Sequence, residues 1–541
     1  MPDEPLLAAM HVGEPAKFTR RVSLFTAGTA LSRLLGLVRE QVFAYLFGAG
    51  MATDAFNVAF RIPNFFRDLL AENAFSAAFV PELADGLARR RLKEVWRFAN
   101  NVLTVMFLAV GILVALLMLF APQVTGLVAL GFARDAAKLG LTVQLARIMM
   151  PFLLFVALGA WAMGMLNTQG SFFVPAAAPG VFNLVSIVVP IATYAVLQAQ
   201  GLPPILGMAY GVTIGACFQF LVQLPALYRH GYRFAPILDL KDRNLQQVLL
   251  VRLPFRALGL ATWQINFLVS TFLITFLPQE GSVTYLNYAY RIMHLPAGLF
   301  GVAIGSVALV ELSSASSSGM GGLAQERLQQ ALVLVAVIML PVAALLIALA
   351  EPVVQVIYQH GRFTSADTAA TSHALVLYCM GVWAPAASRC IASSFYARKD
   401  THTPALAGLI AVCFCITMNL MLMRRIGFLS FALSTALAQM IDFGILYLIY
   451  HRRNQGISDR TLLRLIARIV LMAILCGAAA LAVFRVTGLL SWSGTIALLV
   501  RLLIAGCSGL VVYYTASRLL GIDEVRATLE QLLPRRCPTS R

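Results

Sequence analysis

An apolar stretch near the start of the chain, from Thr53 to Leu83, contains several side chains that could bind an ion. Four of them follow the spacing i, i+3, i+7 and i+11 and therefore share one face of a helix: Arg61, Asn64, Asp68 and Glu72. Arg67 lies about a third of a turn away from that face. Pro63 removes a backbone donor from the same helix, which predicts a kink and a carbonyl group freed toward water.

Two further apolar stretches carry charged groups away from their ends. The run LSRLLGLVRE holds four polar side chains around Gly36, namely Ser32, Arg33, Arg39 and Glu40. The run YAYRIMHLP holds Arg291 and His294 one turn apart. A charge at the centre of a bilayer costs about 2.5 to 3.5 kcal/mol on insertion scales, so each of these groups must face water or a partner.

Two interpretations fit these charges. In the first, the arginines form buried ion pairs with nearby acids, or extend to the lipid headgroups; the candidate acids are Glu40, Asp54, Asp68 and Glu72. In the second, they line a polar cavity, because they cluster in three stretches while several other apolar stretches have none in their interiors. We favour the cavity for the set as a whole. Guanidinium groups bind phosphate oxygens in pairs, which predicts a ligand with phosphate or carboxylate groups.

The composition indicates which elements position these groups. Of the 541 residues, 60% are hydrophobic and 12% are charged, and the mean hydropathy is +0.81, whereas an average soluble protein is about a quarter charged. The sequence therefore predicts an all-α integral membrane protein. Segments of about 20 apolar residues recur along it and predict about 14 transmembrane helices. Their centres fall near residues 35, 68, 110, 155, 186, 215, 262, 297, 337, 383, 412, 440, 474 and 506.

The basic residues predict the orientation in the membrane. Basic loops such as ARRRLKEVWR alternate with loops that have few or no basic residues, such as QAQGLPP. Because basic loops stay in the cytoplasm, both termini should be cytoplasmic. Only Arg424 and Arg425 oppose this assignment. The basic loops also account for the net charge of +17, and no basic, aromatic surface domain exists to bind nucleic acid, so no such partner is expected.

Three short echoes with nearly the same offset along the chain indicate an internal duplication. The pairs are AFRI at 59–62 with AYRI at 289–292, PEL at 81–83 with VEL at 310–312, and the loops that end at Pro175 and Pro404. Six predicted helices separate the copies, so both copies enter the membrane in the same direction. We therefore predict two six-helix lobes around a central cavity, followed by two C-terminal helices.

The sequence lacks the familiar motifs of enzyme chemistry. It has no HExxH, GxxxxGK[ST] or GxSxG motif, and its eight cysteines are scattered without a CxxC pair. We therefore expect no enzyme activity, no cofactor, no metal site and no disulfide, and the sequence leaves a coupling ion open. A cation or drug antiporter would need an acidic or aromatic cavity. A polyprenyl-phosphate glycosyltransferase would need paired acids with a metal, or a nucleophile.

Several runs together resemble one bacterial family. They are SRLLGLVRE, FGAGMATDAFNVAFRIPNFFRDLLAENAFSAAFVP, YRIMHLPAGLFGVAIG, QHGRFT and FYARKDTHTP. They resemble the peptidoglycan lipid II flippases, the MurJ or MviN family, of the multidrug, oligosaccharidyl-lipid and polysaccharide exporter superfamily. The resemblance extends from about residue 20 to about residue 520. It implies transport of undecaprenyl-pyrophosphate bearing the disaccharide-pentapeptide from the cytoplasmic to the periplasmic leaflet of the inner membrane, by alternating access, for cell wall synthesis.

The resemblance also implies roles for individual residues. The implied substrate-binding residues are Arg39, Arg67, Arg291, Ser32, Arg33 and Asn64, and the first three match an arginine triad near the substrate pyrophosphate. The residues implied in gating or charge balance are Asp54, Glu72, Glu40 and His294. Glu40 replaces an aspartate that is common in the family. Tyr290 and His294 stand where some members carry acids, so the role of those acids in this chain is in question.

The expected domains follow from the lobes and the resemblance. They are a cytoplasmic lead-in (1–20), an N-lobe of helices 1 to 6 (21–230), an amphipathic interlobe linker (231–245), a C-lobe of helices 7 to 12 (246–455), two extra helices that form a lipid groove (456–520) and a basic cytoplasmic tail (521–541). The expected partners are lipid II and membrane lipids. The peptidoglycan synthesis machinery is a further candidate.

Overall fold

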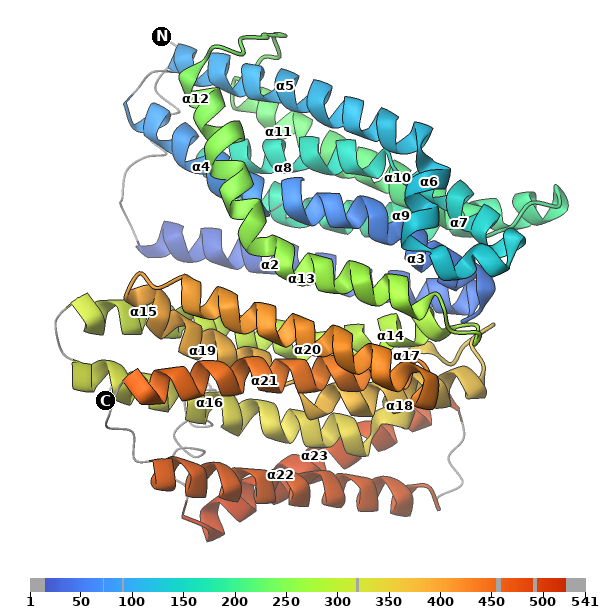
Figure 1. Cartoon of the computed structure of the whole chain (residues 1–541), viewed down its shortest axis with the longest axis vertical. Coiled ribbons are helices and arrows are strands. Elements are labelled where there is room, and N and C mark those ends of the chain that lie inside the picture. The colour runs from blue at the N-terminus through green and yellow to red at the C-terminus, as the bar shows by residue number, and fades with distance from the viewer. Residues whose placement is uncertain are drawn as a thin grey trace, which may run out of the picture. The chain divides into compact units, whose positions relative to one another are not determined.

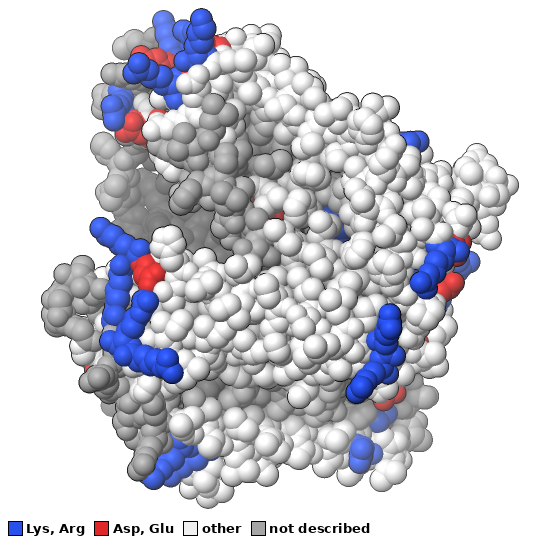
Figure 2. Space-filling model, viewed as in Figure 1, with Lys and Arg blue, Asp and Glu red and all other residues white. Residues whose placement is uncertain are grey.

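Long helices make up the part of the chain that the computed structural model describes, which is residues 15–71, 73–89, 92–317, 321–453, 459–489 and 494–521 (Figure 1). No strand occurs within these ranges. In Figure 2 a broad band of uncharged side chains covers the helix flanks, and Lys and Arg gather where helices end. The all-helical membrane fold predicted from the composition is confirmed for this part of the chain.

The chain divides into two compact units, the first formed by residues 1–283 with 360–362 and the second by the remainder. The elements of the first unit are α2 (Pro15–Phe47), α3 (Met51–Phe66), the π-helical turn η2 (Arg67–Ala71), α4 (Asn73–Ala88), α5 (Leu92–Leu119), α6 (Ala121–Val128), η3 (Leu130–Arg134), α7 (Ala136–Met149), α8 (Phe152–Thr168), α9 (Phe173–Ala199), α10 (Leu206–Leu221), α11 (Leu224–Arg229), α12 (Arg243–Gln246), η4 (Gln247–Arg252) and α13 (Leu253–Ile274). Within this unit α13 packs on α3, η2, α4 and α6. The predicted lobe boundaries stay a prediction.

The second unit holds the remaining helices. They are α14 (Ser282–Pro296), the π-helical turn η5 (Ala297–Gly301), α15 (Val302–Ser317), α16 (Gly321–Ala348), α17 (Ala350–Tyr358), α18 (Ser365–Met380), α19 (Ala384–Ala397), α20 (His402–Ile426), α21 (Leu429–Arg453), α22 (Asp459–Thr487) and α23 (Thr495–Leu519). The last two pack along each other, and α22 also packs on α16 (Figure 1).

Eleven helical segments in the described ranges are long and apolar enough to cross a membrane. Each contains one of the predicted centres from 110 to 215 or from 297 to 506. The three other predicted centres, at residues 35, 68 and 262, fall in α2, η2 and α13, which are also helical. The predicted count of fourteen spans stays a prediction.

The helix boundaries repeat with the offset that the sequence echoes indicate. Helices α5 and α16 begin at Leu92 and Gly321, and both their starts and their ends are separated by the same offset as the echoed loops. Helices α9 and α20 begin with that offset too. The π-helical turns η2 and η5 begin at Arg67 and Ala297, with the offset of the echo between AFRI and AYRI. The helix boundaries therefore support the duplication independently of the sequence echoes.

Two of the three π-helical segments in the described residues, η2 and η5, follow a proline, whereas η4 does not. Pro63 lies inside α3 and has no N–H to donate, and the Arg67 N–H that follows bonds to the carbonyls of Asn64 and Pro63. Pro296 is the last residue of α14, directly before η5. A proline removes one hydrogen bond of the α-helical ladder, and a widened turn is one way for the backbone to continue. Helix α3 continues through Pro63 and changes to the π-helical turn η2 at Arg67, and the predicted kink and freed carbonyl stay a prediction.

Two glycines allow a loop of the chain to dock on the turn between α2 and α3. The Arg362 N–H donates to the Tyr45 carbonyl at 3.0 Å. Gly48 and Gly361 both have positive φ, of 63° and 61°. A Cβ on Gly48 would lie 2.6 Å from the Arg362 carbonyl oxygen, and a Cβ on Gly361 would collide with the Tyr45 carbonyl. Only glycine combines these backbone angles with so close an approach.

The segment predicted as an amphipathic linker has neither helix nor strand over residues 232–239. Two neighbouring asparagines of α5 hold it. Asn100 Oδ1 accepts from the Tyr232 hydroxyl at 2.6 Å, and Asn101 exchanges hydrogen bonds with the Asp239 backbone N–H at 2.9 Å and carbonyl at 2.8 Å. These contacts fix the register of the linker on α5.

Asp400 orders the turn between α19 and α20. Its carboxylate accepts from the Thr403 backbone N–H at 3.0 Å and from the Thr403 hydroxyl at 2.7 Å. Arg453, at the end of α21, donates to the same carboxylate at 2.7 Å and lies over the ring of Phe395. The carboxylate thereby ties the α19–α20 turn to α21.

We expect the stability that Asp400 contributes to depend on pH. The hydrogen bonds from Thr403, followed by the contact with Arg453, hold the pKa of Asp400 below its ordinary value. Such a carboxylate stabilises the fold above its unfolded pKa of about 4, and the contribution is lost as the pH falls below that value. Asp400→Ala should lower the melting temperature at pH 7 by about 1 to 3 °C, and the difference from wild type should shrink at pH 3. Equal differences at both pH values would contradict this account.

Candidate functional site

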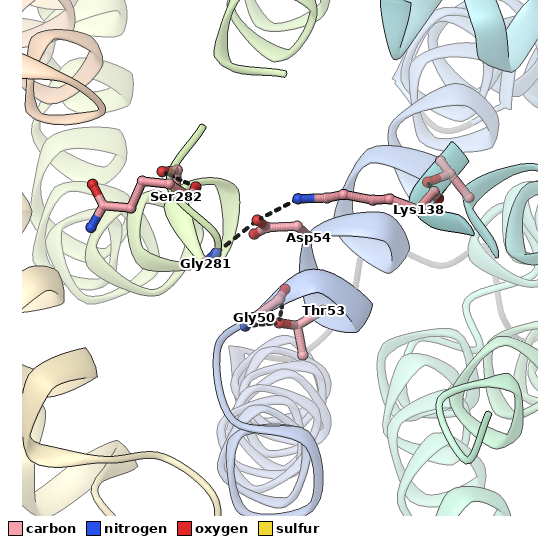
Figure 3. A network of polar contacts seen from close by, with 8 residues as sticks. Gly50, Thr53, Asp54, Lys138, Gly281 and Ser282 are labelled. Carbon is pink, nitrogen blue, oxygen red and sulfur yellow. Dashed lines mark hydrogen bonds and ion pairs between the residues drawn. The ribbon is translucent and has the colours of Figure 1, made fainter. Parts of the chain in front are cut away.

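Asp54, in the first turn of α3, is the centre of a buried polar network (Figure 3). Its side chain is 1% exposed. Its Oδ2 accepts from the Gly281 backbone N–H at 2.8 Å and from Lys138 Nζ at 3.4 Å. Beside it, the Thr53 hydroxyl accepts from the Gly50 N–H at 2.8 Å and caps the helix. The start of α3 is thus tied to α7 and to the turn that precedes α14.

Lys138 is the partner that sequence reasoning missed. It lies in the first turn of α7, where its own N–H donates to the capping residue Asp135 at 3.1 Å. Its ammonium group lies 4.3 Å from the centre of the Phe132 ring, and its side chain is 10% exposed. A lone cation in the run ARDAAKLG gave no sign of its partner, because Asp54 is 84 residues away in the chain.

Arg67 and Asp68 form an ion pair inside η2. Arg67 donates to Asp68 Oδ1 from Nε at 3.0 Å and from Nη2 at 2.8 Å. The other carboxylate oxygen, Oδ2, accepts from Gln264 Nε2 of α13 at 2.9 Å. The two side chains of the ion pair are 26% and 23% exposed. Asp68 therefore joins the candidate substrate arginine to α13.

The polar face predicted for α3 is turned toward α13. The Arg61 guanidinium lies 5.1 Å from the centre of the Phe267 ring, and Asp68 bonds to Gln264, so the two helices are antiparallel here. Asn64 lies between these contacts on the same face, and its buried Oδ1 has no hydrogen-bond partner within the described residues. Part of the predicted polar face is therefore a contact between helices. This position favours the ion-pair interpretation for Asp68.

The polar residues of α2 are placed in different surroundings. Arg39 donates to Glu40 Oε1 from Nε at 3.2 Å and Nη2 at 2.7 Å, and its guanidinium lies 5.4 Å from the centre of the Phe182 ring. The backbone carbonyl of Ser32 accepts from Asn183 of α9 at 3.0 Å. Arg33 is exposed. Of these residues, Arg39 and Glu40 form an ion pair, which agrees with the ion-pair interpretation.

In the second unit, Arg291 and His294 are exposed on α14. The His294 ring stacks on Tyr290 at a centroid distance of 5.2 Å, and Tyr290 in turn meets Tyr378 of α18 edge-on at 5.7 Å. Arg389 of α19 is a further exposed arginine within an apolar span, and the sequence analysis did not single it out. Glu72 lies outside the described residues, so its predicted role stays a prediction.

These contacts give the site two arginines, Arg39 and Arg67, each balanced by the acid that follows it in the chain. A guanidinium in apolar surroundings binds phosphate oxygens strongly, because both hydrogen bonds and charge act where little water competes. The adjacent acids moderate that affinity. Such an arrangement can bind an anionic headgroup reversibly.

Comparison with known proteins places the chain among lipid carriers. The sequence profile of a family described as "Lipid II flippase MurJ" matches residues 43–500. A curated relative, the probable lipid II flippase MurJ of Rhizobium meliloti (strain 1021), is 32% identical over 450 residues, which cover 83% of each chain. A solved structure described as lipid II flippase MurJ in an inward closed conformation has a TM-score of 0.73 and 27% identity, and covers 92% of this chain and 99% of that chain.

The fold is shared more widely. An inward-facing structure of a multidrug resistance MATE family transporter of the MOP superfamily has a TM-score of 0.61 at 14% identity, and covers 83% of this chain and 97% of that chain. At that identity the likeness concerns the fold alone.

Proposed function

Since this chain belongs to the MurJ family of lipid II flippases, we propose that it carries lipid II from the cytoplasmic to the periplasmic leaflet of the bacterial inner membrane. The observation that carries the proposal is that two partly buried arginines in apolar helices, Arg39 and Arg67, each form an ion pair with the acid that follows in the chain. A pyrophosphate headgroup suits such guanidinium groups. No covalent bond changes, so the protein acts as a transporter and not as an enzyme.

Alternating access explains how the headgroup crosses. A pyrophosphate cannot pass through hydrocarbon unaided, because moving a charge from water into an apolar medium costs many kcal/mol. A polar cavity that opens first to the cytoplasm and then to the periplasm removes that barrier. In our proposal two six-helix lobes enclose the cavity, and Arg39, Arg67 and Arg291 contact the pyrophosphate. Ser32, Arg33 and Asn64 complete the binding site.

The polyprenyl tail needs a separate, apolar path. Helices α22 and α23 pack along each other and are largely apolar, with exposed side chains such as Leu503 and Val511. We assign the tail to a groove formed by these two helices, so that it stays in contact with lipid while the headgroup crosses. They correspond to the last two of the predicted spans.

Orientation follows from the basic loops. We place both termini in the cytoplasm, because the loops on that side carry the excess of Lys and Arg. The proposal involves no cofactor. Moving one charge through the membrane potential is worth about 2.3 kcal/mol per 100 mV, which is one candidate energy source beside a coupling ion. The peptidoglycan synthesis machinery is a candidate partner.

A complementation experiment tests this function. The wild-type chain is expected to restore growth in bacteria depleted of their own lipid II flippase, and to raise the amount of lipid II that reaches the outer leaflet. Expression and membrane insertion are measured in the same cells. A well-expressed, inserted protein that restores neither growth nor lipid II translocation would overturn the proposal and favour another lipid-linked oligosaccharide as the substrate.

A further inference from the structure

We propose that Asp68 is a built-in substitute for the substrate pyrophosphate. It holds the Arg67 guanidinium while the carrier is empty and releases it to the headgroup when lipid II binds. The proposal rests on the proposed function, and it assigns a role to an acid that the sequence analysis named only as a possible ion-pair partner.

The Arg67–Asp68 contact is not the kind of pair that stabilises a helix. Adjacent residues point about 100° apart around an α-helix, and stabilising pairs are three or four residues apart. The chain has such a pair between Arg89 and Asp85, at 3.0 Å on the exposed surface of α4. Arg67 instead curls back onto its neighbour with two hydrogen bonds to one oxygen. Helix stability therefore gives no reason for this pairing.

The exposure of the pair permits exchange. The side chains of Arg67 and Asp68 are 26% and 23% exposed, whereas those of Lys138 and Asp54 are 10% and 1% exposed. The Asp54 pair is closed off by packing and cannot take another partner without unpacking the helices around it. An anion can reach Arg67 without such unpacking. The two pairs thus have different uses, one structural and one exchangeable.

Gln264 gives the displaced carboxylate a remaining partner. Its Nε2 donates to Asp68 Oδ2, while Arg67 donates to Oδ1. When the headgroup takes Arg67, Asp68 therefore keeps one hydrogen bond. A carboxylate left without any partner in apolar surroundings would carry a large penalty. The contact with α13 lowers the cost of the exchange.

A similar pair lies at the second proposed substrate arginine of the first unit, but it is less exposed, with side chains that are 13% and 9% exposed for Arg39 and Glu40. Arg39 donates twice to Oε1 of Glu40, the residue that follows it in the chain. At Arg67, whose pair is the more exposed of the two, the tethered acid competes with the ligand at a high effective concentration. Such competition weakens binding enough for the lipid to leave, which transport requires as much as it requires binding.

The test compares affinity with rate in the purified, full-length protein. Asp68→Asn is expected to bind lipid II in nanodiscs about tenfold more tightly, a change of about 1.4 kcal/mol. In proteoliposomes it should also transport lipid II more slowly, so that KM and kcat fall together. Asp85→Asn is the matched control, because it removes the same charge from the exposed pair with Arg89 and should change neither quantity.

The outcomes separate this proposal from the proposed function. If wild type binds and transports lipid II while Asp68→Asn binds it equally well or more weakly, the substitute role is refuted and the proposed function stands. If wild type neither binds nor transports lipid II, both are overturned. Should Asp68→Asn fail to fold, Asp68→Ser carries the same test, because it too removes the carboxylate and should tighten binding. Unchanged or weaker binding by that variant would refute the proposal.

Discussion

Arg67→Ala is expected to abolish lipid II transport and to leave a folded, membrane-inserted protein. Losing a charge-assisted contact to a partly buried anion costs about 2 to 5 kcal/mol, which is a decrease in rate of about 30-fold or more. Arg39→Ala and Arg291→Ala should have the same effect, since all three guanidinium groups contact the pyrophosphate in the proposed mechanism. Growth of flippase-depleted cells and transport in proteoliposomes are the two measurements.

A double variant separates the loss of the guanidinium from the loss of charge balance. Arg67→Ala alone leaves Asp68 with Gln264 as its partner and one uncompensated negative charge. Arg67→Ala with Asp68→Asn restores neutrality but still lacks the phosphate contact, so it should remain inactive. Arg89→Ala, at an exposed pair, is the matched control and should retain transport. Full growth of cells that carry any of the three alanine variants would contradict the arginine mechanism.

Lys138→Met is expected to lower the free energy of unfolding by about 3 to 5 kcal/mol. The variant removes the Lys138 ammonium from the 1%-exposed Asp54 carboxylate, which keeps its hydrogen bond from the Gly281 N–H. Removing the charge as well, in Lys138→Met with Asp54→Asn, should recover most of the loss, because an amide oxygen can still accept from Gly281. Thermal and chemical unfolding in detergent give the comparison.

The control for this prediction is an exposed ion pair. Arg97 and Asp239 lie 3.3 Å apart with side chains that are 67% and 38% exposed, and Arg97→Ala should change the free energy of unfolding by about 1 kcal/mol or less. A Lys138→Met protein that is as stable as Arg97→Ala would show that Asp54 does not need its cation. The network in Figure 3 would then be a consequence of packing and not a source of stability.

The helices were predictable because their signal is local. Each of the eleven apolar spans contains a predicted centre, since some twenty consecutive apolar residues are visible in the sequence wherever they occur. The neighbouring acids Glu40 and Asp68 could be named as ion-pair partners, because each directly follows its arginine in the chain.

Partners that are distant in the chain were not predictable. Asp54 takes Lys138 at a separation of 84 residues, and Asp68 takes Gln264 at a separation of 196. A single sequence does not show which helices pack against each other. A lysine that is buried at the start of a helix therefore cannot be distinguished from a lysine in an exposed loop. The irregular course of residues 232–239 was missed because it depends on two asparagines in α5 that bind the linker.

The docked loop around Gly361 affects when the first unit can finish folding during synthesis on the ribosome. Residues 360–362 belong to the first unit, although the stretch of the second unit from 284 to 359 is made before them. At a synthesis rate of about 5 to 20 residues per second, the first unit therefore waits roughly 4 to 16 s after residue 283 for its final segment. During that time the Tyr45 carbonyl lacks the Arg362 amide, so a chaperone or insertase has an interval in which this turn is still open.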